Sequence, residues 1–220
     1  MSIFPPTRDL TMQCFKCSKV AGRTHNLYFS KNMVKRYYVR RNFSNILECL
    51  GRASNFKRCL DFGFGMGIML PGLSSVFEGV IDIDIDIKQL EAAEKVRNAC
   101  NLKNVQLVVR SEENELTDFD NGSFDCIIAD NVLEHITDPA PIVLEFYRIL
   151  AEGGVLIVPL PSQNAIYRLF ENKNDGHVLR TSKQILGLIN EIESIFIPIS
   201  RSDIFPFFIT RIFRKSSGKI

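Results

Sequence analysis

A glycine-rich loop after a short apolar segment is the part of the sequence best suited to bind a ligand. Residues 59–67 read CLDFGFGMG, with glycines at alternate positions, Gly63, Gly65 and Gly67. Glycine has no Cβ, so the backbone can turn sharply and a ligand can approach it closely. A loop of this kind between a strand and a helix is typical of proteins that bind nucleotide-like cofactors.

The spacing of the glycines favours one class of cofactor. A dinucleotide-binding loop would have a glycine or alanine at position 68, which is Ile68, and a P-loop would have Lys followed by Ser or Thr instead of Ile68 and Met69. Asp61, two residues before Gly63, suits a positively charged ligand better than a pyrophosphate. These observations favour S-adenosylmethionine, which carries an ammonium and a sulfonium group.

A second acidic position follows at the distance expected for a carboxylate that binds ribose. Residues 79–84 read GVIDID, and Asp84 lies 21 residues beyond Gly63 (84 minus 63). In βαβ units, an acid about 20 residues beyond the loop hydrogen-bonds the ribose hydroxyls. Asp84 is favoured over Asp82 and Asp86 because it ends the predicted strand just before a helical pattern begins.

An alternation of strands and helices is predicted to position these residues. We expect strands at 58–62, 79–84, 105–110, 124–130 and 154–159, and helices at 67–77, 87–100, 139–150 and 162–171. A last helix is expected from Ser182 to Asn190, and closing strands are expected at 195–199 and 207–213. Such an alternation predicts βαβ units and a parallel sheet.

Length, composition and charge favour one α/β domain with a basic extension. The chain has 220 residues, of which 45% are apolar, enough to bury a core. Residues 1–60 contain 12 Lys or Arg and 2 Asp or Glu, which the net charge of +2 conceals. We expect a basic N-terminal segment with a lid helix over 1–56, and a cofactor-binding domain over 57–220.

Aromatic and basic residues alternate in the N-terminal segment, at Tyr28, Phe29 and 34–41 (VKRYYVRR). We interpret the latter stretch as a lid helix with apolar side chains inward and solvated cations outward. The alternatives are a surface for anionic substrates, for acidic lipid headgroups or for RNA. The stretch from Ile204 to Lys215 is interpreted as a terminal strand with a basic end, and a peripheral membrane contact is the alternative.

Together these motifs resemble those of the class I S-adenosylmethionine-dependent methyltransferases of the small-molecule group, type 11, which is similar to the quinone-biosynthesis methyltransferases. The likeness covers about Lys57 to Asn190 and includes residues 121–139 (NGSFDCIIADNVLEHITDP) and 148–159 (RILAEGGVLIVP). The resemblance implies a Rossmann-like three-layer α/β sandwich. Its sheet would have seven mostly parallel strands and an antiparallel edge hairpin.

The resemblance also implies roles for single residues. Asp61 and the three glycines would border the methionine half of the cofactor, and Asp84 would hold the ribose. An acid after the third strand would contact the adenine amine, and we favour Glu112 over Glu113. The predicted cofactor-binding residues are Asp61, Gly63, Gly65, Gly67, Asp84, Ile85, Glu112 and Asp130.

The predicted reaction is methyl transfer from S-adenosylmethionine to a small-molecule or lipid-like acceptor, at oxygen. The sulfonium is already an activated leaving group, so the protein mainly aligns the reactants and excludes water. An oxygen nucleophile must also lose a proton, and His135, expected after the fourth strand, is placed to accept it. A purely structural role in ordering that loop is an equal alternative. His177 is interpreted as an exposed loop residue, with a place in the acceptor pocket as its alternative.

Two other functions stay open. One is an RNA methyltransferase that uses the basic N-terminal surface, and the other is a catalytically silent protein that acts on a partner. The intact glycines and Asp84 argue against the silent protein. Methylation of DNA bases is disfavoured because Asp130 and Asn131 are not followed by the two prolines and aromatic residue of the amino-methylating enzymes. Cys126 lies within a predicted strand and lacks the context of a cytosine-methylating nucleophile.

No metal site is predicted. Cys14 and Cys17 form a single C-x-x-C pair with His25 as the nearby third ligand, whereas structural zinc takes four ligands. We expect this pair to be reduced. The other cysteines fall in apolar patterns, where free cysteine behaves as a small hydrophobic residue; they are Cys49, Cys59, Cys100 and Cys126.

No stretch of the sequence has the length and apolar character of a membrane-spanning helix. Residues 1–6 (MSIFPP) lack the apolar core of a signal peptide. A cytoplasmic location is therefore expected, with peripheral membrane contact as the alternative raised by the basic and aromatic stretches. The patterns predict no oligomeric state.

Overall fold

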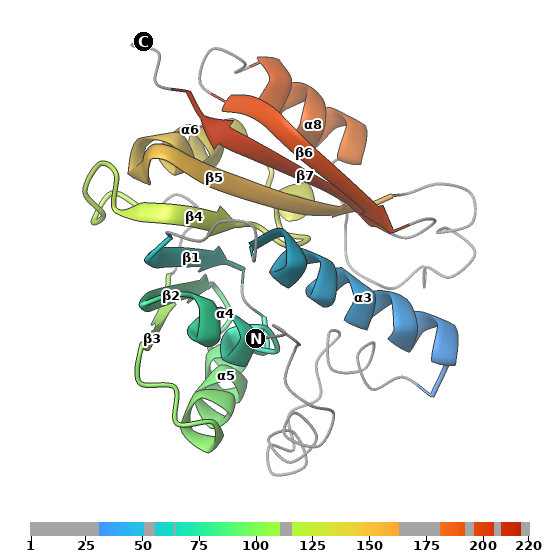
Figure 1. The fold of residues 1–220 in the computed structure, drawn as a ribbon, viewed down its shortest axis with the longest axis vertical. Helices are drawn as coiled ribbons and strands as arrows, with labels where there is room; N and C mark the ends of the chain where they lie inside the picture. The colour runs from blue at the N-terminus through green and yellow to red at the C-terminus, as the bar shows by residue number, and fades with distance from the viewer. Residues whose placement is uncertain are drawn as a thin grey trace. The chain divides into compact units, whose positions relative to one another are not determined.

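The fold is described from a computed structural model, which covers residues 31–50, 56–63, 65–110, 116–162, 181–191, 196–204 and 208–216. Its strands are β1 (Arg58–Phe62), β2 (Gly79–Asp84), β3 (Val105–Val109), β4 (Phe124–Ile128), β5 (Leu150–Pro161), β6 (Phe196–Ile204) and β7 (Phe208–Lys215). The helices are α3 (Met33–Leu50), α4 (Leu70–Val76), α5 (Ile87–Ala99), η1 (Leu133–His135), α6 (Ala140–Ile149) and α8 (Ser182–Glu191). Figure 1 labels most of these elements.

The described strands form a seven-stranded sheet in the order β3-β2-β1-β4-β5-β7-β6. The pairs β1–β2, β2–β3 and β4–β5 are parallel, and β7 pairs antiparallel with both β5 and β6. The predicted α/β class, with a mostly parallel sheet and an antiparallel hairpin, is confirmed. The chain divides into two compact units, residues 1–111 and 112–220.

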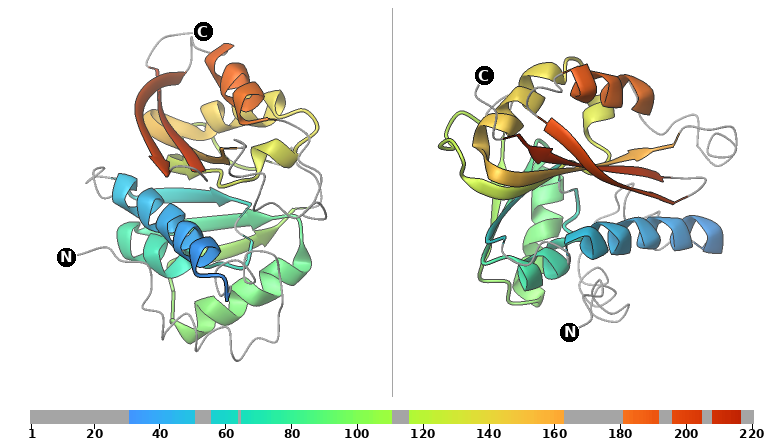
Figure 2. Two further views of the ribbon diagram at one scale, coloured as in Figure 1. Left: turned by 90° about the vertical axis from the view of Figure 1, so that its right-hand side faces the viewer. Right: turned by 45° about the horizontal axis from the view of Figure 1, so that its top comes forward.

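In the first unit, β1, β2 and β3 lie in register, with Cys59 opposite Val80 and Val80 opposite Val105. Helices α4 and α5 contact one another and pack against β2, and α5 also packs against β3. Figure 2 shows these helices beside the three strands. The buried residues of α5 include Ala92 and Ala93, whose small side chains allow the helix to approach its neighbours closely.

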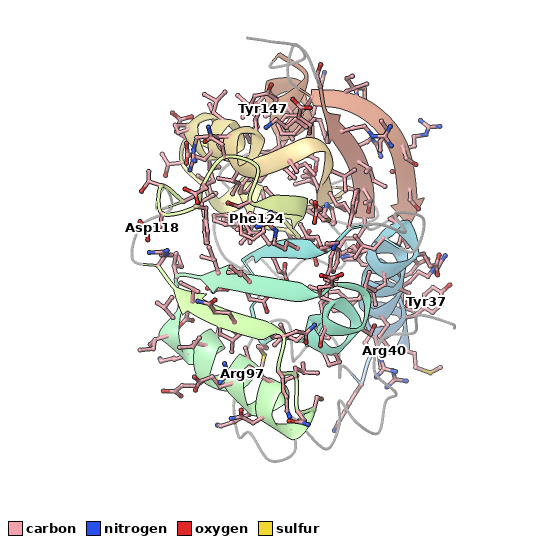
Figure 3. All side chains as sticks on the ribbon, turned by 60° about the vertical axis from the view of Figure 1, so that its left-hand side comes forward. Tyr37, Arg40, Arg97, Asp118, Phe124 and Tyr147 are labelled. Atoms are coloured by element: carbon pink, nitrogen blue, oxygen red, sulfur yellow. The ribbon has the colours of Figure 1, made fainter. Side chains whose placement is uncertain are left out.

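Helix α3, the helix predicted within the N-terminal segment, differs between its two ends. Most apolar side chains of its last two turns are buried, and these turns contact α4, where a Cβ on Gly72 would lie 2.7 Å from Leu47 Cδ1. Its first turns expose apolar side chains, and Tyr37 is 60% exposed. Figure 3 shows Tyr37 and Arg40 on this helix. The predicted division of the chain after residue 56 and the lid role of α3 stay predictions.

In the second unit, the hairpin of β6 and β7 extends the sheet beyond β5 (Figure 1). Helix α6 packs against β5 and contacts α8. Phe196 of β6 is buried and meets the rings of Tyr147 and Phe213 at centroid distances of 5.8 and 6.4 Å. These contacts give the hairpin an aromatic core of its own.

Several predicted boundaries were wrong at the ends of elements. Strand β5 begins at Leu150 instead of residue 154, because the chain passes through Gly153 at φ 73° and Phe124 pairs with Leu150 before a register shift. The glycine loop continues as turns up to Met69, so α4 begins three residues later than expected. Strand β6 extends to Ile204, well past its predicted end. The helix expected at 162–171 lies, except for Ser162, outside the described residues.

Candidate cofactor site

The loop after β1 is shaped by glycines in a left-handed backbone conformation. Gly63, Gly65 and Gly67 have φ angles of 82°, 56° and 71°. L-residues with a Cβ adopt this region at a cost, so glycine is the residue that the loop geometry requires. The amide of Gly63 donates a 2.7 Å hydrogen bond to the carbonyl of Ile83, which continues the ladder between β1 and β2 into the loop.

Gly67 ends the loop where it meets α5. A Cβ at this position would lie 2.9 Å from Ala93 Cβ and 3.0 Å from Ala93 Cα, closer than side chains pack. The Gly67 carbonyl accepts a 3.3 Å hydrogen bond from the amide of Leu70 at the start of α4. The missing side chain therefore lets the loop lie directly against α5.

Asp84 is the last residue of β2, and its carboxylate reaches the glycine loop. Its Oδ2 accepts a 2.9 Å hydrogen bond from the amide of Gly65, and its Oδ1 accepts a 2.9 Å hydrogen bond from the amide of Asp86. A carboxylate has about four acceptor positions, so each oxygen keeps capacity for another donor. A ligand with two adjacent hydroxyl groups matches this remaining capacity.

Burial is the main influence on the charge of this carboxyl group. It raises the pKa of Asp84 above its ordinary value, and the repulsion of Asp86 adds a smaller effect in the same direction. Backbone hydrogen bonds from Asp86, Gly65 and Ile85 lower the pKa and offset part of the effect of burial. The loop amides thus support the ionised form that would accept hydrogen bonds from a diol.

The two acids that competed with Asp84 in the sequence have other places. Asp86 is the N-cap of α5, where its side chain accepts a 2.9 Å hydrogen bond from the amide of Lys88. The spacing of Asp86 and Gln89, which matches a capping box, is the sequence signal for this role. Asp82 is fully buried inside β2, directly opposite Asp61 of β1. This pairing of acids was not predicted from the sequence.

The residues predicted after the fourth strand lie together in the second unit. The amide of Asn131 donates to the carbonyl of Pro159 at 3.0 Å, which extends the β4–β5 ladder by one step. Asn131 has a φ of 53°, and its side chain donates a 2.7 Å hydrogen bond to Asp130 Oδ1. His135 is the last residue of the short helix η1, and its amide donates to the carbonyl of Val132 at 3.0 Å.

Ile85, in the connection between β2 and α5, is 62% exposed. Glu112, Glu113 and His177 lie outside the described residues, as do the predicted reduced pair Cys14 and Cys17 and their neighbour His25. Within the part of the chain that the structure describes, no cluster of three or more His, Cys, Asp or Glu has the arrangement of a metal site. The same part contains no helix that is both long and apolar enough to cross a membrane.

The first unit therefore presents the parts that a nucleoside with a cationic substituent requires. The glycine loop offers backbone that a ligand can approach, Asp84 offers acceptors for a diol, and Asp61 is an acid at the end of the adjacent strand. The described residues of this loop do not form a phosphate cradle, because the buried acid and the carboxylate that anchors the loop would repel phosphate.

Comparison with known proteins identifies this arrangement. A methyltransferase domain family matches residues 60–158. Ubiquinone biosynthesis O-methyltransferase from Psychrobacter cryohalolentis is 31% identical over 67% of this chain and 56% of its own. The ubiquinone/menaquinone biosynthesis C-methyltransferase from Pectobacterium carotovorum is 34% identical over 51% of this chain and 45% of its own. The chain thus spans about half the length of the curated relatives it matches.

A solved structure shares the fold over the whole chain. The N-methyltransferase NodS from Bradyrhizobium japonicum, in complex with S-adenosyl-L-homocysteine, aligns with a TM-score of 0.68 at 14% identity. The alignment covers 98% of this chain and 99% of that protein. Residues 60–158 thus match the methyltransferase domain family, and together with the curated relatives and the shared fold they support a class I S-adenosylmethionine-dependent methyltransferase of the type 11 group.

Proposed function

We propose that this protein transfers a methyl group from S-adenosylmethionine to an oxygen atom of a small-molecule or lipid-like acceptor. The proposal rests on one observation. The backbone amide of Gly65, in the glycine loop, donates a hydrogen bond to the carboxylate of Asp84 at the end of β2. The loop is shaped for close approach of a ligand, and the acid keeps acceptors for a ribose diol. When bound, the cofactor supplies a methyl group on a positively charged sulfur.

In this proposal the residues of the first unit hold the cofactor. Asp84 accepts hydrogen bonds from the ribose hydroxyls, and Ile85 packs beside the adenosine. Asp61 faces the ammonium of the methionine end, where its negative charge is complementary. Gly63, Gly65 and Gly67 border the methionine half, and their positive φ angles suit the loop for that place. The predicted contacts of Glu112 and Asp130 with the cofactor also remain part of the proposal.

The choice of oxygen as acceptor rests on the relatives and on one residue. The first curated relative is named an O-methyltransferase, whereas another relative is a C-methyltransferase and NodS is an N-methyltransferase. An oxygen acceptor must lose its proton, and histidine is the side chain that most often serves as a general base. His135, half-exposed in the short helix after β4, is the residue we assign to accept that proton.

Methyl transfer is tested with the full chain and methyl-labelled S-adenosylmethionine. Cell extract is incubated with the protein, and the products are separated into lipid, polar metabolite and RNA fractions. We expect label in the lipid or polar metabolite fraction, attached through a methyl ether, and no label with Gly65→Val. Label in RNA, with binding that weakens steeply as salt increases, would favour the RNA methyltransferase instead. Cofactor binding without label in any fraction would favour a silent protein.

We also propose that α3 brings the enzyme to an anionic membrane surface, where a lipid-like acceptor would be found. Met33, Val34 and Tyr37 are 71%, 44% and 60% exposed on its first turns. The helix contains four basic residues and one acid, a balance complementary to anionic headgroups. Apolar side chains beside cations are the combination that favours such an interface.

Vesicle sedimentation tests this contact. The protein should bind vesicles of phosphatidylglycerol and phosphatidylcholine and should not bind vesicles of phosphatidylcholine alone. Met33→Ser combined with Tyr37→Ser should weaken binding, whereas Leu144→Ser, which changes a 49% exposed residue on α6, should leave it unchanged. Equal loss in both variants would argue against a specific role for α3.

A further inference from the structure

Asp82 is a fully buried acid that the proposed function does not use. It lies within β2 with 0% exposure, and neither carboxyl oxygen has a hydrogen-bond partner in the part of the chain that the structure describes. An ionised carboxylate in that position would cost several kcal/mol. Burial raises the pKa of Asp82 well above its ordinary value, and the charge of Asp61 adds to this effect. Burial and the charge of Asp61 therefore both favour the neutral, protonated form of Asp82.

The neighbour of Asp82 on β1 is a second buried acid, Asp61, which is 4% exposed. The two residues are register partners on adjacent parallel strands. Side chains of register partners point to the same face, and adjacent strands lie about 4.8 Å apart. Two carboxyl groups so close and so buried do not both ionise without a neighbouring cation, because like charges repel strongly where water is excluded.

Other charged groups around β2 lie at its end or on exposed surfaces. Leu107 of β3 is the register partner of Asp82 on the other side, and α4 contains no titratable residue. The buried residues of α5 are apolar, and its charged residues are exposed or partly exposed. Among the described residues of β1, β2 and β3, the charged residues besides this pair are Arg58 at the start of β1 and Asp84 at the end of β2, and Arg110 follows β3.

We propose that Asp61 and Asp82 share one proton beneath the glycine loop, and that binding of the cationic methionine end of the cofactor at Asp61 releases this proton to solvent. The inference rests on the cofactor role proposed above for Asp61. With one proton the pair carries a single negative charge in the ligand-free protein. A cation beside Asp61 favours the ionised form of the pair, so cofactor binding and proton release are linked.

In this arrangement Asp82 is a positioning residue. It does not touch the ligand, because it lies inside the strand two residues before Asp84. Its carboxyl group acts through Asp61. In the empty site the shared proton reduces the negative charge on Asp61. When the cation binds and the proton leaves, Asp61 carries its full negative charge. Affinity for the cofactor should then rise with pH across the range in which the pair titrates.

Calorimetry tests the proton release directly. S-adenosylhomocysteine, which carries the same ammonium group, is titrated into the protein in two buffers of different ionisation enthalpy between about pH 5 and 8. The wild type should release up to one proton per ligand, and its affinity should rise by up to about tenfold per pH unit. Asp82→Asn keeps the shape and cannot ionise, so it should release none and bind with nearly constant affinity. Glu94→Gln, which removes an exposed acid of α5, should behave as the wild type.

Infrared spectroscopy of the ligand-free protein tests the pair without any ligand. The band of a neutral carboxylic acid should be present at neutral pH in the wild type and in Glu94→Gln, and absent from Asp82→Asn. Asp61→Asn should also abolish proton release and should lower the affinity for S-adenosylhomocysteine.

Equal proton release in the wild type and Asp82→Asn would overturn the inference. So would binding of S-adenosylhomocysteine by the wild type without release of a proton. If the wild type bound no S-adenosylhomocysteine, the proposed function would fail, while the infrared band would still report on the acid pair.

Discussion

The backbone amide of Gly65 donates a 2.9 Å hydrogen bond to Asp84 Oδ2. This bond joins the loop after β1 to the end of β2, which are neighbours because the two strands are parallel and in register. The other oxygen of Asp84 is held by the amide of Asp86. One carboxylate therefore fixes the shape of the loop before a ligand arrives, and the same carboxylate is the predicted ribose acceptor. Loop order and cofactor affinity should thus depend on a single side chain.

Asp84→Ala should lower affinity for S-adenosylhomocysteine by about 10-fold to 100-fold, as expected for the loss of charge-assisted hydrogen bonds of about 1.5–3 kcal/mol. The measurement is titration calorimetry at a fixed pH. Asp86→Ala is the matched control, because it removes a neighbouring acid but leaves the Asp86 amide on Asp84. It should cost about 0.5–2 kcal/mol of stability through the lost cap and change affinity little. Equal affinity in the two variants would show that Asp84 does not hold the ribose.

Gly67→Ala should both destabilise the protein and weaken cofactor binding. The new Cβ would meet Ala93 at 2.9 Å, and the φ of 71° would cost an L-residue a further 1–2 kcal/mol or so. Gly79→Ala is the control, since nothing lies within 4 Å of a Cβ there. Urea unfolding should show a clear loss of stability in Gly67→Ala and little change in Gly79→Ala. Unfolding curves with the same midpoint for both variants would contradict the packing of the loop against α5.

Asp82→Asn should change how stability depends on pH. Because burial raises the pKa of Asp82 in the folded protein, the folded chain keeps a proton that the unfolded chain loses just above the ordinary value of 3.8. Wild-type stability therefore falls as pH rises from that value to the raised pKa, by up to about 1.4 kcal/mol per pH unit. Asparagine cannot ionise, so the variant should gain stability over the wild type as pH rises from about 4 towards the raised pKa of Asp82.

The measurement is the thermal unfolding temperature of both proteins across that pH range. The two proteins are compared by the slope of unfolding temperature against pH. The substitution to asparagine also shifts the unfolding temperature by an amount that does not depend on pH, and the slope is insensitive to that shift. Glu94→Gln again serves as the control, and its curve should run parallel to that of the wild type. Parallel curves for Asp82→Asn and the wild type would mean that Asp82 is already ionised in the folded protein.

The glycine loop and Asp84 were predictable because local patterns determine them: glycines after an apolar strand and an acid at the end of the next one. The start of β5 was not, because it depends on the pairing of Leu150 with Phe124, residues far apart in the sequence. The Asp61–Asp82 pair was missed for the same reason. Register between strands is a tertiary property, and it alone brings two acids from separate segments side by side.

Kinetics can separate two possible roles of His135, acceptance of a proton from the acceptor and ordering of the loop after β4. If it accepts the proton of an oxygen acceptor, His135→Gln should lower turnover by about 100-fold or more and leave cofactor affinity intact. The wild-type rate should then rise with pH, because only the deprotonated imidazole can accept the proton. If His135 only orders the turn in which its amide bonds Val132, glutamine should preserve both the rate and the shape of the pH profile. The sulfonium supplies much of the driving force, so an acceptor that ionises unaided would need no base. The decisive test therefore uses an acceptor whose hydroxyl stays protonated at neutral pH. If His135→Gln has the turnover and pH dependence of the wild type on that acceptor, the residue only orders the loop. If the variant loses the pH dependence, the residue takes part in proton transfer.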